Sequence, residues 1–236
     1  MRARTARGVG WQPGGAALAA LGVLLAAAGA GRADSVIVGG LPYEGVEVIA
    51  ADPYSIVFRP RSGRTVSRPV AEVSRLQIRG AGRLNEAETH AGDEEWDAAL
   101  AAYDKAVATV PEKWRPLAKG RRLWALKRAG RLGGAVEAWL ELVDAAGEAE
   151  RPQALARVPS EPAEKGSKAN ARAVELLEQR AGKAEGALLR EVRRLLLKLY
   201  RLEGQTEKAA AVAAALTGRP ASDGRPDGAG QPPAGA

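Results

Sequence analysis

Few side chains in this sequence have the type and spacing that catalysis or metal binding requires. The 236 residues include no Cys and one His, His90, which excludes disulfides, thiolate nucleophiles and Cys-ligated metal sites. Acidic side chains gather at residues 93–95 and at Asp97, and pairs of carboxylates carry out glycoside hydrolysis. These acids follow a predicted helix start, where negative charge stabilises the helix dipole, so we interpret them as structural. We therefore expect a protein that is not an enzyme and that has no catalytic residue, metal ligand or cofactor.

Five other side chains are candidates for contact with a ligand or partner. Arg59, Arg61 and Arg64 belong to the one local basic cluster of the sequence, and they either lie solvated in a loop or contact an anionic polymer. Trp114 and Trp124 lie further along the chain, either in the core or in a binding groove. Because a Trp side chain buries a large area, we expect core packing for both and keep the groove as the alternative.

The N-terminal segment, residues 1–33, has the pattern of a secretory signal peptide. A basic start is followed by an apolar run rich in Ala and Leu and then by small residues, so we predict cleavage after Ala33 or after Ala30. The alternative is a retained membrane anchor, although a run of about seventeen residues is shorter than the roughly twenty that a spanning helix needs. That anchor is the only membrane contact that the sequence predicts. The expected location is the periplasm or the outside of the cell.

Cleavage of the predicted signal peptide would also change the net charge of the protein. The formal net charge of the chain is +7, and four of its basic residues are arginines of segment 1–33, so without that segment the net charge is +3. Such a balance is ordinary for a soluble surface, and we expect no nucleic-acid partner. The composition is rich in Ala and Leu and includes one Phe, which favours helices over a large β-fold.

Residues 34–80 alternate between apolar and polar side chains, which is the pattern of half-buried strands. Gly39-Gly40 and Asp52-Pro53 are turn signals, and residues 70–73 are typical of a single helical turn. The pattern predicts five short strands, near residues 35–38, 44–49, 54–58, 65–66 and 75–79. Strands this short bury one face only if the sheet bends strongly, and a small barrel provides that bending.

Three segments of this module resemble SH3-like or Sm-like small β-barrels. They are Tyr43–Val48, Ile56–Phe58 and Val73–Ile78, which occur together with Gly63 and Val66. The resemblance implies a barrel over residues 34–80, of the kind that some bacteria export fused to helical repeats. Sm-like proteins often bind RNA, but their nucleotide-binding residues are not found in this segment.

From residue 83 to residue 217 the apolar period becomes that of amphipathic helices. Near its start, large and small residues alternate at helical spacing before a proline, in the order Trp96, Ala99, Tyr103, Ala106, Pro111. The order returns around Ala135 and Ala209, which lie 36 and a further 74 residues along the chain, and a degenerate copy is predicted at Ala173. This order resembles the tetratricopeptide repeat, whose period is about 34 residues. The resemblance implies antiparallel helical hairpins, each of which needs a neighbour to bury its apolar face.

Two stretches differ from this helical pattern. Pro152, Pro159 and Pro162 interrupt residues 147–167, which are predicted to form an open loop on the array or a linker that divides it. Residues 218–236 are rich in Gly, Pro, Ala and Asp and have almost no apolar bulk, so we predict a disordered tail.

The predicted fold class is α+β and mainly α, with a small N-terminal β-barrel followed by a tetratricopeptide-like array of antiparallel helical hairpins. The resemblance implies an exported, non-enzymatic scaffold or adaptor that binds a protein or peptide through the helical surface. The alternative is an envelope protein whose β module binds a polyanion or another ligand. Neither the oligomeric state nor the identity of the partner follows from the sequence.

Overall fold

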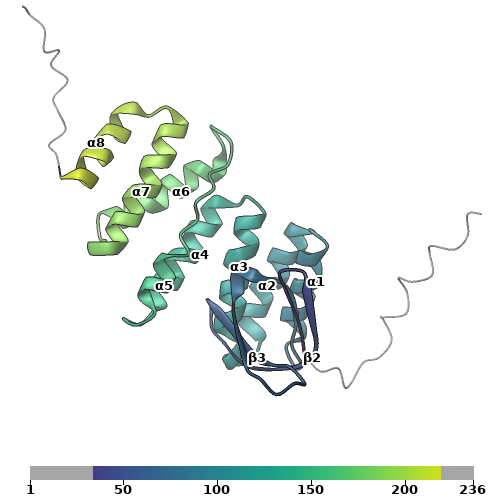
Figure 1. The fold of residues 1–236 in the computed structure, drawn as a ribbon. Helices are drawn as coiled ribbons and strands as arrows, with labels where there is room; N and C mark the ends of the chain where they lie inside the picture. The colour runs from purple at the N-terminus through teal and green to yellow at the C-terminus, as the bar shows by residue number, and fades with distance from the viewer. Residues whose placement is uncertain (1–33, 219–236) are drawn as a thin grey trace, which may run out of the picture. The chain divides into compact units, whose positions relative to one another are not determined.

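The computed structural model describes residues 34–218, in which a β-sheet is followed by a series of α-helices (Figure 1). More than half of these residues are helical, which confirms the predicted α+β, mainly α class. The predicted signal peptide, residues 1–33, and all but the first residue of the predicted tail lie outside the described residues. Between residues 34 and 218, no helix is both long enough and apolar enough to cross a membrane.

The strands of the sheet occur close to the predicted positions. They are β1 (Asp34–Val38), β2 (Leu41–Ala51), β3 (Ser55–Arg59), β4 (Val66–Pro69) and β5 (Val73–Gln77), with a short 3-10 helix, η1 (Val70–Glu72), before β5. Within the described residues the five strands lie in the order β4-β3-β2-β1-β5, and all neighbours are antiparallel. Gly39 and Gly40 both have positive φ and form the two-residue turn between β1 and β2. Because β4 and β5 are the two ends of this order, closure into a barrel stays a prediction.

The turn between β2 and β3 is fixed by the side chain of Asp52. Its Oδ1 accepts hydrogen bonds from the backbone N–H groups of Tyr54 and Ser55, each at 2.6 Å, and its Oδ2 accepts one from the Ser55 hydroxyl at 2.8 Å. Asp is favoured in turns because its short side chain can make such local bonds. The tip of the turn, Pro53 and Tyr54, is thereby held in one conformation.

The helices follow in chain order and are joined by short connections, except after α5. They are α1 (Gly82–Gly92), α2 (Trp96–Thr109), η2 (Glu112–Trp114), α3 (Arg115–Arg128), α4 (Leu132–Ala145), α5 (Arg151–Leu155), α6 (Lys168–Ala181), α7 (Gly186–Glu203) and α8 (Thr206–Thr217). Each long helix packs against the next, and α4 packs against α6. Ala99 and Ala135 are fully buried and Ala209 is nearly so, which allows neighbouring helices to approach closely. Membership of the tetratricopeptide family stays a prediction.

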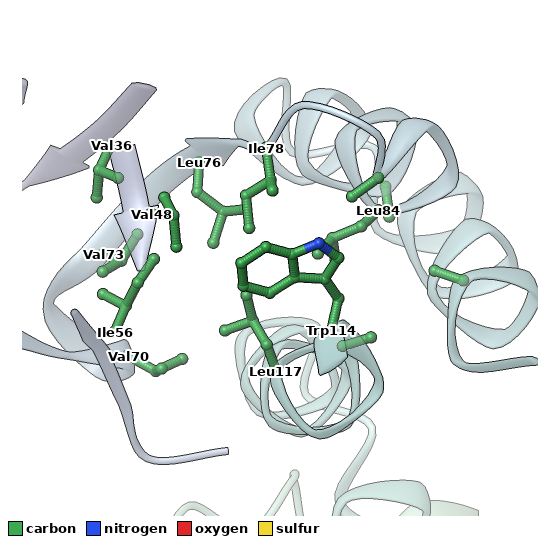
Figure 2. Packing of buried hydrophobic residues seen from close by; sticks show 14 of the residues in the cluster. Val36, Val48, Ile56, Val70, Val73, Leu76, Ile78, Leu84, Trp114 and Leu117 are labelled. Carbon is green, nitrogen blue, oxygen red and sulfur yellow. The ribbon is translucent and has the colours of Figure 1, made fainter. Parts of the chain in front are cut away.

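The sheet and the first helices share one hydrophobic core. Figure 2 shows Val36, Val48 and Ile56 of the sheet facing Trp114 and Leu117 of the helical part, and all five side chains belong to one buried cluster. The alternation along β1 and β3 places every second side chain in this core, as expected for strands with one buried face. Burial of these apolar side chains therefore joins the sheet to the helices.

The β2–β3 turn also rests directly on α3. A Cβ atom added at Gly120 would lie 2.4 Å from the carbonyl oxygen of Pro53, so only a glycine allows this approach. Next to this contact, the side chain of Tyr54 is buried in a second apolar cluster with Leu123 and Leu126. The turn therefore extends from the sheet into the helical region.

A buried ion pair connects α1 to α3. The Arg121 guanidinium donates from Nε to Glu88 Oε1 and from Nη2 to Glu88 Oε2, both at 2.7 Å, and both side chains are fully buried. The Tyr103 hydroxyl of α2 donates a third hydrogen bond to Glu88 Oε1, at 2.6 Å. Burial and the neighbouring Glu88 carboxylate raise the pKa of Tyr103 well above its usual value, so the phenol stays protonated.

The same ion pair also binds the backbone of the sheet. Arg121 Nη1 donates to the carbonyl oxygen of Val73 at 2.6 Å, and Glu88 Oε2 accepts a hydrogen bond from the Leu76 N–H at 3.2 Å. Burial alone would lower the pKa of Arg121, but Glu88 and Tyr103 outweigh this effect and raise it. The two buried charges are thus compensated by each other and by polar groups of β5, as buried charges must be.

We expect this network to be essential for stability. In an Arg121→Met variant the Glu88 carboxylate loses its partner, and removal of one member of a buried ion pair costs about 3–5 kcal/mol. Arg122 provides a matched control because its pair with Asp104 is partly exposed to solvent, and the loss of a surface pair costs at most about 1 kcal/mol. Urea unfolding of the two Met variants measures both effects. Equal losses of stability would contradict the assigned role of Arg121.

The contact between Gly120 and Pro53 gives a second prediction. A Gly120→Ala variant must displace the β2–β3 turn, and such overpacking costs about 1–3 kcal/mol. At Gly82 an added Cβ meets no atom within 4 Å, so Gly82→Ala should leave the free energy of unfolding unchanged or slightly raised. Thermal unfolding of both variants tests the difference, and a stable Gly120→Ala protein would mean that the turn does not rest on α3.

Candidate binding site

A hollow of about 210 Å³ lies where the sheet, α3 and the connector between α5 and α6 meet. We refer to residues 156–167 as the connector and to this space as the basic hollow. Residues from all three parts line it: Pro53, Val70, Ala71, Gly120, Leu123, Trp124, Lys127, Arg128, Arg157 and Glu161. These lining residues come from segments that are far apart in the sequence, so the hollow forms only in the folded protein.

The α3 side of the basic hollow follows from helical spacing. Gly120, Leu123, Trp124 and Lys127 are separated by three and four residues, which places them on one face of the helix. The Trp124 indole is held by the Arg121 guanidinium, whose Cζ lies 4.1 Å from the ring centroid. An edge-on contact with Trp96, at 5.9 Å between centroids, adds a further constraint.

The connector side is fixed by hydrogen bonds to the turn and to α6. Arg157 Nη2 donates to the carbonyl oxygen of Tyr54 at 2.9 Å, and the same oxygen accepts a hydrogen bond from the Val70 N–H at 2.8 Å. Further along, the buried side chain of Asn170 bonds to the backbone of Ala163 through both of its polar atoms, at 3.0 and 3.1 Å. These bonds hold the connector against the sheet and explain why a segment rich in proline has a defined path.

The charge of the basic hollow is predominantly positive. Lys127, Arg128 and Arg157 stand against one acid, Glu161. Partial burial and the Arg157 guanidinium lower the pKa of Lys127, and Glu161 raises it in part. Lys127, Arg157 and Glu161 therefore lie close together. With three cations and one acid in its lining, the basic hollow is suited to an anion.

A second hollow, of about 330 Å³, lies beside the same turn and is also lined by Pro53. We call it the mixed hollow, because Asp52, Glu112 and Glu150 line it together with two cations, Arg115 and Lys119. Burial, Glu150 and Asp52 raise the pKa of Tyr54, which also lines this space. Pro53 thus contributes to a positively charged hollow and to one in which acids outnumber bases.

The predicted arginine cluster lies on β3 and on the loop before β4, and none of its members lines the basic hollow. Arg59 forms an exposed ion pair with Glu47 at 3.3 Å. The Arg61 guanidinium lies over Gly45, where an added Cβ would come within 2.8 Å of Nε, and Arg64 is exposed. Two of the three arginines therefore have intramolecular contacts.

The two predicted tryptophans have different environments. Trp114 is buried in the core between the sheet and the helices, whereas Trp124 is only partly buried and lines the basic hollow. Trp139 of α4 is fully buried and donates from Nε1 to the Ala154 carbonyl at 3.0 Å.

His90 and two of the acids singled out in the sequence, Glu95 and Asp97, have partners nearby. His90 Nδ1 lies 2.6 Å from Glu95 Oε2, and Asp97 forms an exposed ion pair with Arg131. In the part of the chain that the structure describes, no group of three His, Cys, Asp or Glu side chains is placed to bind a metal ion.

Several residues of the basic hollow were not singled out in the sequence. Lys127 and Arg128 form a basic pair at the end of α3, and their spacing from Trp124 indicates a shared helix face. Arg157 and Glu161 lie in the segment predicted as a loop or linker, and no local pattern places them beside the sheet.

The opposite influences of Arg157 and Glu161 on Lys127 can be measured. We expect Arg157→Ala to raise the pKa of Lys127 towards its usual value and Glu161→Gln to lower it further, since the first removes a cation and the second an anion. NMR titration of isotope-labelled dimethyl-lysine side chains reports these pKa values directly. Arg190→Ala, an exposed change on α7, is the control and should have no effect. Identical titrations in all four proteins would show that these groups are not close together.

Comparisons with known proteins give no relative from which a function could be transferred. No protein-family model matches the chain, and no curated protein or solved structure matches it at the significance that we required. The functional proposal therefore depends on the residues around the β2–β3 turn.

Proposed function

We propose that the chain is a non-enzymatic adaptor that binds a peptide segment of another protein beside the β2–β3 turn. The observation that supports this proposal is the pair of hollows that share Pro53 and lie along α3. The basic hollow is lined by the C-terminal half of α3, and the mixed hollow by residues near its start. An extended peptide could contact both in succession, whereas a compact molecule would fill only one.

The size of the basic hollow favours a single side chain of a larger partner. Pockets for drug-sized molecules measure about 300–1,000 Å³. The basic hollow, at about 210 Å³, is smaller than this range. It is suited to an anchoring side chain, and anchors of this kind supply most of the affinity at protein interfaces.

The rigidity of the surroundings also supports binding. Asp52 fixes the turn, and the carbonyl oxygen of Tyr54 joins the turn to η1 and to the connector. A site that is ordered before the ligand arrives loses less conformational entropy on binding. Helical hairpins of the kind that the tetratricopeptide resemblance implies commonly present such surfaces to peptides.

The proposed partner is extracytoplasmic, because the pattern of residues 1–33 is that of a signal peptide. The adaptor would then act in the periplasm or outside the cell. The alternative site at Arg59, Arg61 and Arg64 has weaker support, since Arg59 is paired with Glu47 and Arg61 lies against the backbone of Gly45.

Selection of short random peptides on the immobilised full chain tests this function. We expect enriched peptides whose affinity falls by about tenfold or more in an Ala71→Tyr variant, because the new ring would fill the basic hollow. Ala98→Tyr, at an exposed position of α2, is the matched control and should bind normally. Unfolding curves confirm that both variants are folded. The proposal fails if no peptide is enriched, or if Ala71→Tyr binds the enriched peptides as well as the wild type does.

A further inference from the structure

We infer that the group which enters the basic hollow is a carboxylate carried next to an apolar side chain of the peptide. This inference rests on the proposed function and assigns the chemistry of the anchor. The shared chemistry can come from two sources, an acidic side chain or the carboxyl terminus of the partner. Both are available on an unmodified peptide.

The first observation is that no cation of the basic hollow forms an ion pair with another described residue. Ten ion pairs occur among residues 34–218. None of these pairs includes Lys127, Arg128 or Arg157. Arg157 does donate one hydrogen bond, to the Tyr54 carbonyl, and a guanidinium has further N–H groups to offer.

The second observation is the proximity of these cations to one another. Lys127 and Arg157 line the same hollow, and burial together with the Arg157 guanidinium lowers the pKa of the lysine. A carboxylate placed between them would remove this repulsion and would accept hydrogen bonds from both groups. Hydrogen bonds between charged partners are stronger than those between neutral ones.

The third observation is the apolar part of the lining. Val70 and Leu123 are buried, and Trp124 is partly buried beside them. Low-dielectric walls strengthen the attraction between the cations and an entering anion. They also favour an anion that arrives with an apolar group, because that group can cover the exposed part of the lining.

Glu161 limits the affinity of this site in the free protein. It is the one acid in the lining of the basic hollow, and it partly offsets the lowered pKa of Lys127. A ligand carboxylate has to approach Lys127 against the charge of Glu161. Neutralisation of this residue should therefore strengthen binding, which is an effect that damage to the fold would not produce.

Three defined probes test the inference on the full chain. N-acetyl-leucyl-glutamate amide carries a side-chain carboxylate, N-acetyl-leucine carries a terminal one, and N-acetyl-leucyl-glutamine amide carries neither. NMR signals of labelled dimethyl-Lys127 follow the titration with each probe. We expect saturable shifts with one or both carboxylates, binding weaker by about tenfold or more with the neutral probe, and a loss of the difference at high salt.

Two test variants and one control variant complete the test. Glu161→Gln should bind the carboxylate probes several-fold more tightly, Arg157→Ala should bind them more weakly, and Arg190→Ala on α7 should match the wild type. Equal binding of the charged and neutral probes, or no gain in Glu161→Gln, would overturn the inference.

The two proposals can fail separately. If the charged and neutral probes bind equally but the enriched peptides still bind Ala71→Tyr more weakly than the wild type, the adaptor function would stand while the carboxylate assignment fails. If carboxylate probes bind but no peptide is enriched, the basic hollow would be a carboxylate site while the adaptor function fails.

Discussion

The buried ion pair between Glu88 and Arg121 is the interaction on which the arrangement of the sheet and the helices depends. It contacts α1, α2 through Tyr103, α3, and the backbone of β5. Ion pairs in a low-dielectric interior gain little net stability, because removing both charges from water is costly, but a misplaced partner is strongly unfavourable. The pair therefore acts mainly through geometry, since it allows only the arrangement in which four elements meet around it. The position of α3, and with it the lining of the basic hollow, follows from this constraint.

The contact between Pro53 and Gly120 adds a second constraint to the same helix. The turn that carries Pro53 belongs to the sheet, yet Tyr54 is buried among side chains of α3 and α4. A part of the α3 surface is therefore covered by the chain itself. What remains open lies on either side of the turn, and this explains why the candidate site is a pair of small hollows rather than one long groove.

Local patterns in the sequence predicted the strands and the presence of amphipathic helices but not their meeting points, and they did not predict the short helix α5, which lies in the stretch 147–167. The alternation around Ile56 and Phe58 and the Gly39-Gly40 turn located the strands, and the burial of Ala99 and Ala135 agrees with the close helix approach expected there. Glu88 and Arg121, in contrast, are 33 residues apart, and neither position differs in pattern from an exposed helical charge. Arg157 is 103 residues from Tyr54, its hydrogen-bond acceptor. Such pairs are determined by tertiary packing, which overrides local preference, so the basic hollow could not be assembled from the sequence alone.

The position of the turn on α3 has a consequence for how this architecture can evolve. Arrays of helical hairpins usually grow or shrink by duplication or deletion of whole hairpins, because each hairpin contacts only its neighbours. Exchange of the hairpin of α3 and α4 would break contacts with the sheet, since Gly120 packs against Pro53 and Arg121 donates to Val73. The hairpin of α7 and α8 makes no comparable contact with the strands in the described residues. We therefore expect a change in the number of hairpins to disturb the sheet less at the C-terminal end of the array than at α3 and α4.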